Sequence, residues 1–153
     1  MTLHVVLSRV AGRVYAFPSS RVVEVIPRVM AKALPQIADW VLGWINYRGR
    51  LILALDFSRL LGHGACTPRM ANRILVVQTG ETKGEENELT GVLVEAVIGS
   101  ELFDFGDSAA HARMAPPTAS FLTDVSLADS EMVQLVDPLK LPRPFAEPED
   151  VSC

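Results

Sequence analysis

The sequence predicts a mainly β domain with a few short helices, in which two similar barrels pack together. Short apolar runs rich in Val, Ile and Leu recur along the chain between Gly, Pro and polar clusters, as in strands joined by turns. Several runs are apolar at consecutive positions, which is typical of strands buried on both faces in small packed barrels. A faint internal repeat also indicates two similar halves around a shared apolar seam.

The expected strands are short apolar stretches rich in β-branched residues and bounded by turn-forming residues. They lie at residues 4–10, 13–17, 44–47, 50–56, 72–79, 90–97 and 132–137. Helical signals between these runs are brief, so we expect the helices to be few and short.

Four short helical turns are expected between the strands. Residues 18–27 can open a turn at the serines after Pro18, which Pro27 would close, and residues 35–43 can run from a proline to a glycine. Asp56 and Asp137 each stand before a short apolar stretch as N-cap residues. Pro138 then occupies the first helical position, where its missing N–H does no harm.

The internal repeat has an offset of 81 residues. Placing Asp56 over Asp137 aligns residues 40–56 with residues 121–137 without a gap, so that Trp40 falls on Phe121. Both copies end in an aspartate followed by a short helix. Less exactly, "RVYAFPSSRVVEV" near the start resembles "LTGVLVEAVI" later in the chain. The duplication predicts two barrels of similar construction.

Size and composition limit the domain count and the class of partner. The 153 residues suffice for one compact domain. We expect residues 1–145 to form this single domain of two barrel subdomains, and residues 146–153 to be a flexible C-terminal tail. The net charge is −4, with no block of Lys or Arg, so no nucleic-acid partner is expected.

The sequence favours a cytoplasmic protein. No apolar stretch reaches the roughly 18 residues that a membrane-spanning helix needs, so no direct membrane insertion is expected. The first residues lack the features of a secretory signal. Cys66 and Cys153 are the only cysteines, a poor framework for a disulfide, which fits a reducing compartment.

The stretch "WINYRGRLILALD" places two arginines inside an otherwise apolar run. Its simplest geometry is strand, tight turn, strand, with Gly49 supplying the positive φ that such a turn requires. Arg48 and Arg50 then lie at the turn tip and reach solvent, so no buried charge is needed.

Several motifs together resemble the CheW-like domain of bacterial chemosensory systems. The sequence has "VVEVI", "PQIADWVLGWINYRGRLILALDFSRLLG", "RILVVQT", "GVLVEAV" and "MVQLVDPLKL". The family pattern runs V-x-E-I, G-V-I-N-L-R-G-x-I-x-P-V-I-D-L-x-x-L-L-G, R-I-L-V-V and G-L-x-V-D-x-V. The resemblance spans roughly residues 5 to 142. It is most specific in the second stretch, which keeps both the Arg-Gly turn and the aspartate before the helix.

The resemblance implies two packed, SH3-like, five-stranded β-barrels and a scaffold without catalytic activity or cofactor. Proteins of this family couple the cytoplasmic tip of methyl-accepting chemoreceptors to the regulatory domain of a CheA-type histidine kinase. Carried over by position, Arg48 and Gly49 sit in the turn at the groove where a receptor helix docks. The residues expected to contact the receptor or the kinase are Val22, Glu24, Arg48, Gly49, Gly91 and Val97.

This assignment agrees with the physics of helix recognition. A helix in a groove needs an apolar floor, which Val22 and Val97 would supply, and a few charged edges. Arg48 suits a carboxylate or the carbonyls at a helix C-terminus, because its planar fork makes paired hydrogen bonds. Tyr47 replaces the family's Leu and Ala54 its Pro. These departures indicate a specialised system, separate from the flagellar one.

Each of these residues also has a purely structural interpretation. Arg48 could serve only to keep a turn soluble, and Glu24 could simply face water on a short helix. Val22, Val97 and Gly91 could serve only core packing or turn geometry. Spacing by itself favours these interpretations, and the resemblance favours contact for Arg48 and Glu24.

Two other functions fit the sequence less well. A small-molecule-binding regulatory barrel would need convergent polar groups, of which the apolar strands offer few. A hydrolase using Asp56 and Asp137 is unnecessary, because both residues are explained as helix caps. His63 and Cys66 share one loop, but two ligands are too few for a metal site, so no metal is expected.

Overall fold

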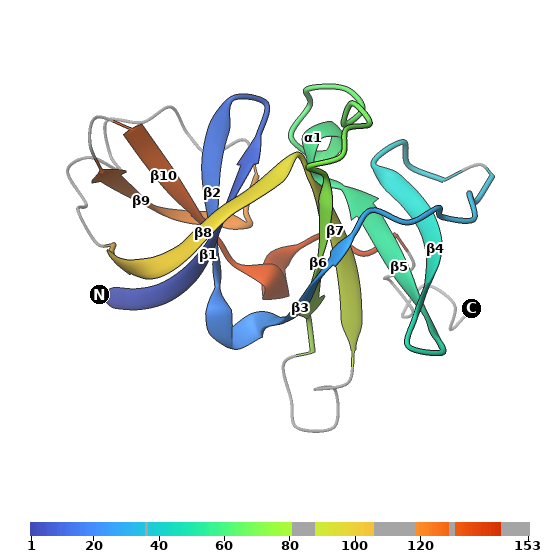
Figure 1. The fold of residues 1–153 in the computed structure, drawn as a ribbon, viewed down its shortest axis with the longest axis horizontal. Coiled ribbons are helices and arrows are strands. Elements are labelled where there is room, and N and C mark those ends of the chain that lie inside the picture. Colours follow the sequence, from blue (N-terminus) through green and yellow to red (C-terminus); the bar gives the residue numbers. More distant parts are fainter. Residues whose placement is uncertain (36, 81–87, 106–118, 129–130, 145–153) are drawn as a thin grey trace, which may run out of the picture.

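The computed structural model describes residues 1–35, 37–80, 88–105, 119–128 and 131–144. Within these residues the chain forms two five-stranded sheets that lie side by side (Figure 1). The strands are β1 (Thr2–Val10), β2 (Arg13–Pro18), β3 (Val22–Pro27), β4 (Val41–Tyr47), β5 (Arg50–Asp56), β6 (Arg73–Gln78), β7 (Leu89–Val94), β8 (Ala96–Asp104), β9 (Leu122–Ala128) and β10 (Glu131–Val136). The helices are η1 (Ser19–Arg21), α1 (Phe57–Leu60) and η3 (Pro138–Lys140). The mainly β prediction with a few short helices is confirmed.

The two sheets exchange strands. The first sheet has the order β8-β1-β2-β10-β9, and the second has the order β3-β6-β7-β5-β4. The strand β3 follows β2 in the chain but belongs to the second sheet, whereas β8 follows β7 but belongs to the first. Figure 1 shows both crossings between the halves. Each half of the described chain thus contributes an edge strand to the sheet of the other half.

The central strands are buried on both faces, as their continuous apolar runs predict. Residues 14–17 of β2, 74–77 of β6 and 91–94 of β7 are all buried. One core cluster joins both sheets around Phe57, whose ring packs against those of Tyr15 and Phe121. Two further clusters each draw on one sheet. Alternate side chains of one strand thus enter different clusters.

The pairing registers confirm the internal repeat. In the second sheet Val41 pairs with Leu55 beyond a register shift, and in the first sheet Leu122 pairs with Val136 beyond a similar shift. The backbone N–H of Asp56 donates to the carbonyl of Trp40, and that of Asp137 to the carbonyl of Phe121, both at 2.8 Å. Every pair differs from its counterpart by the offset of 81 residues. The two halves therefore repeat at the level of individual hydrogen bonds.

Two of the four helical expectations are confirmed, one is confirmed in part and one is wrong. Asp56 and Asp137 cap α1 and η3 by accepting backbone N–H groups. Within residues 18–27 the serines after Pro18 do open one turn of 3₁₀-helix, but the turn ends at Arg21 and not at Pro27, because the next residues form β3 and pair with β6. Residues 35–43 give no helix among those described, since β4 already begins at Val41. Long-range strand pairing overrides the local signals here.

The expected flexible tail at 146–153 lies outside the described residues. None of the helices in the part of the chain that the structure describes is long and apolar enough to cross a bilayer.

Candidate docking surface

The turn between β4 and β5 carries two residues of the expected site. Arg48 has φ 52° and Gly49 has φ 84°, the combination that a two-residue type I′ hairpin requires. The N–H of Gly49 donates to Asn46 Oδ1 at 2.9 Å and fixes the turn. The positive φ expected at Gly49 is confirmed, and that of Arg48 is a further finding. A two-residue loop between paired strands is the signal that could have revealed it.

The Arg48 side chain folds back onto Glu24. Its Nε and Nη2 atoms donate to Glu24 Oε1 at 3.0 and 2.9 Å. The Arg48 side chain nevertheless remains 71% exposed, against 35% for Glu24. Glu24 lies on β3 and Arg48 follows β4, which are the two opposite edges of the second sheet. Two expected site residues, 24 positions apart in sequence, thus tie these edges together.

Tyr47 completes this cluster, and sequence reasoning noted it only as a departure from the family pattern. Its hydroxyl donates to Glu24 Oε1 at 2.6 Å, and the Arg48 guanidinium lies 5.7 Å from the centre of its ring. The hydrogen bond from Tyr47, followed by that from Arg48, holds the pKa of Glu24 below its ordinary value. The same hydrogen bond to Glu24 raises the pKa of Tyr47. We call Glu24, Tyr47 and Arg48 the edge cluster.

Val22 and Val97 occupy equivalent places in the two halves. Val22 pairs with Val77 on β6, and Val97 pairs with Ser8 on β1, each beside a one-residue register shift. Both are partly buried and pack against the core cluster that joins the sheets. Each valine therefore presents only part of its surface. Val22 lies on β3 close to Glu24, whereas Val97 lies on the other sheet.

Gly91 lies inside the protein, not on its surface. It is buried in β7, and a Cβ atom there would approach Ile74 Cγ2 to 3.0 Å and Ala54 Cβ to 3.3 Å. The missing side chain lets β7 pack closely against its neighbours. Its position supports the structural interpretation of this residue.

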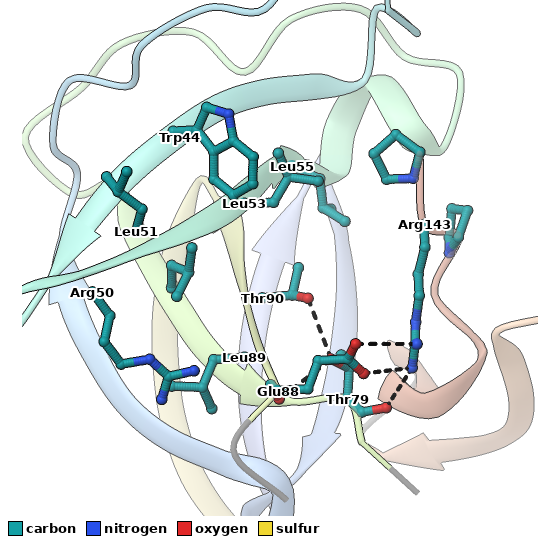
Figure 2. Close-up of a pocket in the computed structure, with 13 residues that line it drawn as sticks. Trp44, Arg50, Leu51, Leu53, Leu55, Thr79, Glu88, Leu89, Thr90 and Arg143 are labelled. Atoms are coloured by element: carbon teal, nitrogen blue, oxygen red, sulfur yellow. Dashed lines mark hydrogen bonds and ion pairs between the residues drawn. The ribbon is translucent and has the colours of Figure 1, made fainter. Parts of the chain in front are cut away.

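A pocket of about 450 Å³ lies beside the same hairpin. Leu51 and Leu53 of β5 and Leu89 of β7 contribute apolar side chains to its wall. Figure 2 shows Glu88 and Arg143 paired at another part of the wall, and both Arg143 Nη atoms approach the Glu88 carboxylate, at 2.9 and 3.2 Å. Sequence reasoning missed this pocket, because Arg143 comes from a segment distant in the chain.

The structure gives the candidate hydrolase residue Asp56 and the candidate metal ligand Cys66 structural surroundings. Asp56 is 3% exposed, and its carboxylate accepts N–H groups from Ser58, Arg59 and Cys66. Burial raises the pKa of the Cys66 thiol, which opposes thiolate chemistry. Among the described residues no three His, Cys, Asp or Glu side chains gather to hold a metal ion.

Two curated proteins align with part of the chain. Protein PilI of Pseudomonas aeruginosa is 32% identical over 95 residues, which cover 62% of this chain and 50% of that protein. Chemotaxis protein CheW of Rhizobium meliloti is 32% identical over 94 residues, which cover 61% of this chain and 52% of that protein. The aligned region thus spans about half the length of either relative.

A solved structure and a family profile cover more of the chain. The crystal structure of the scaffolding protein TtCheW from Thermoanaerobacter tengcongensis matches with a TM-score of 0.71 and 23% identity, covering 89% of this chain and 84% of that one. This likeness shows the fold. The profile of the CheW-like domain matches residues 4–143, nearly all of the described sequence. The chain belongs to the CheW-like domain family.

Proposed function

We propose that this protein is a non-catalytic cytoplasmic adaptor that couples methyl-accepting chemoreceptors to a CheA-type histidine kinase in bacterial chemosensory signalling. Membership of the CheW-like family supports this function. So do a relative named as a chemotaxis protein and a structural neighbour titled a scaffolding protein. The departures at Tyr47 and Ala54 favour a specialised pathway, separate from flagellar control.

The observation that carries the proposal is an exposed arginine held in one orientation at a tight turn. Most of the Arg48 side chain is open to solvent although Glu24 and the Tyr47 ring fix its position. An oriented guanidinium can make directional hydrogen bonds to the carboxylates or terminal carbonyls of a partner helix. We place the receptor tip here, with Val22 as part of the apolar floor.

The kinase regulatory domain would bind a separate surface, because an adaptor must hold both partners at once. Val97 lies on the first sheet, away from the second-sheet turn, and we propose it for that side. Each contact would be modest in area and reversible, with strength arising from many linked copies. A signal would then pass as small shifts between packed surfaces.

The experiment compares Arg48→Ala with Arg13→Ala in binding to a soluble receptor fragment and to the kinase regulatory domain. Arg13 is the control, since it is an exposed arginine directly after a two-residue turn, Ala11-Gly12, whose φ angles of 52° and 77° are similar to those of Arg48 and Gly49. Arg48→Ala should weaken receptor binding roughly tenfold, as expected for loss of a charge-assisted hydrogen bond. Kinase binding and the Arg13→Ala variant should stay near wild type.

Two results would count against the proposal. If Arg48→Ala binds the receptor fragment as tightly as wild type, the docking surface is placed wrongly. If the wild-type protein binds neither partner, the adaptor function itself is wrong.

A small-molecule-binding regulatory domain is the second candidate, and the pocket beside β5 favours it. Its volume of about 450 Å³ falls in the range of ligand sites, roughly 300–1,000 Å³. However, two of its three charged side chains, Glu88 and Arg143, already pair with each other, beside Arg50 as the third, which leaves fewer groups to orient a ligand. A thermal-shift screen with metabolites tests this candidate, because a ligand specific for the folded state gives a saturable stabilisation.

A further inference from the structure

We propose that Tyr47 is a positioning residue of the docking surface, which acts through Glu24 to hold Arg48 in the orientation that meets the partner. This inference rests on the proposed function and adds the residue that determines how the surface is presented.

The first argument is that Tyr47 connects a rigid part of the protein to an exposed ion pair. Its side chain is 7% exposed and packs in the core cluster of the second sheet with Ile45 and Ile52. The hydroxyl emerges from this core to reach Glu24 Oε1 at 2.6 Å. Because packing fixes the ring, the hydroxyl is a fixed donor, whereas Glu24 and Arg48 carry flexible side chains.

The second argument concerns how little an exposed ion pair achieves alone. A pair between solvent-exposed Arg and Glu side chains contributes little stability, since ordering two long side chains opposes the attraction. In the edge cluster the same carboxylate oxygen accepts from Tyr47 as well as from Arg48. The tyrosine ring also lies beside the guanidinium, where cation–π attraction adds to the pairing. Orientation before binding then reduces the entropy lost when the partner docks.

The third argument is that the second half of the repeat has no carboxylate at the position equivalent to Glu24. Gly99 on β8 occupies the place of Glu24, because Gly99 pairs with Leu7 beyond the register shift as Glu24 pairs with Val76. A glycine has no carboxylate to receive a hydroxyl or a guanidinium. The docking surface is therefore asymmetric at this position although the strands repeat, and the Tyr-Glu-Arg combination marks the second sheet as the receptor side.

The test removes a single oxygen atom. Tyr47→Phe keeps the ring in the core and deletes only the donor to Glu24. Tyr15→Phe is the matched control, because it makes the same change in the other tyrosine of the chain, which is buried in the shared core. Tyr47→Phe should weaken binding of the receptor fragment roughly three- to tenfold, which corresponds to the net contribution of about one ordinary hydrogen bond. Kinase binding should be unchanged.

Two further measurements separate positioning from a structural role. In a double-mutant cycle with Glu24→Ala, which removes the acceptor of the Tyr47 hydroxyl, the effect of Tyr47→Phe on receptor binding should largely disappear, since Tyr47 acts through the Glu24 carboxylate. An NMR titration should show that the pKa of Glu24 rises in Tyr47→Phe, because the lost hydrogen bond is the main cause of its lowered value.

The outcomes distinguish this inference from the proposed function. If Tyr47→Phe binds the receptor fragment like wild type while Arg48→Ala does not, Tyr47 has no positioning role and the adaptor function stands. If Tyr47→Phe weakens receptor and kinase binding equally, or is equally harmful in the Glu24→Ala background, the role assigned through Glu24 is wrong. If wild type fails to bind the receptor fragment, the proposed function falls and this inference falls with it.

Discussion

Asp56 and Asp137 stand at equivalent positions of the two halves, yet among the residues that the structure describes their carboxylates accept different numbers of hydrogen bonds. Asp56 accepts the N–H groups of Ser58 and Arg59 through one oxygen and that of Cys66, at 2.9 Å, through the other. Asp137 accepts the N–H of Leu139, at 3.0 Å, as its one side-chain bond within the described residues. The cap is thus preserved in both halves, and in the second sheet Asp56 also links α1 to the following loop.

We therefore expect unequal losses of stability when the two aspartates are truncated. Asp56→Ala should lower the free energy of unfolding by about 3 kcal/mol, because it leaves buried N–H groups without an acceptor. Asp137→Ala should lower it by about 1 kcal/mol, as for an ordinary N-cap. Urea denaturation of both variants measures the difference. Equal losses would show that the Cys66 bond adds nothing.

Gly43 and Gly49 both have positive φ, and comparing substitutions at the two positions distinguishes backbone strain from a steric clash of the added side chain. Gly43 has φ 133°, and a Cβ atom there would lie 2.2 Å from the Lys32 carbonyl oxygen, whereas the same atom at Gly49 would meet nothing within 4 Å. Gly49→Ala should cost only left-handed strain, about 1–2 kcal/mol. Gly43→Ala should cost more, because it also pushes apart the bridge between Lys32 and Trp44. Thermal melts that rank Gly49→Ala as the more harmful change would contradict this account.

A substitution at Gly91 tests whether this residue serves core packing or contact with a partner. Its neighbours Ile74 and Ala54 leave little room for a methyl group, and forcing one into a packed core typically costs about 1–3 kcal/mol. Gly91→Ala should accordingly lower the unfolding free energy by that amount. At a temperature where the variant remains folded, receptor and kinase affinities should match wild type. A selective loss of either affinity without destabilisation would restore Gly91 as a contact residue.

The edge cluster should make the free energy of unfolding depend on pH in the acid range. A carboxyl whose pKa is lowered by folding stabilises the native state above its unfolded pKa, and this contribution is lost as pH falls through the folded value. For Glu24 that range lies below its ordinary value of 4.5. Chemical denaturation between neutral pH and pH 3 should show a smaller acid loss in Glu24→Gln than in wild type.

Two variants test whether both partners lower the pKa of Glu24. Tyr47→Phe and Arg48→Gln should each reduce the acid dependence, because each removes a hydrogen bond that lowers this pKa. A variant whose acid dependence equals that of wild type would show that its residue has no part in lowering the pKa of Glu24.

Strands with two buried faces were the easiest to identify, and edge strands the hardest. The β6 stretch RILVVQ is apolar at consecutive positions and was expected as a strand. The edge strand β3 alternates partly buried and exposed residues and follows a proline and two serines, which suggested a helix. An edge strand gains its conformation from one neighbouring strand, so its local sequence carries a weaker signal.

The sequence by itself determined the mainly β class, the caps at Asp56 and Asp137, the glycine turn and the offset of the repeat. These features depend on periodicity, on a few neighbouring residues and on comparison of one stretch with another. Tertiary structure decided that Glu24, Tyr47 and Arg48 meet, that Gly91 is enclosed, and that the halves exchange β3 and β8. Such contacts join residues far apart in sequence, and only the folding of the second sheet brings its two edges within hydrogen-bonding distance.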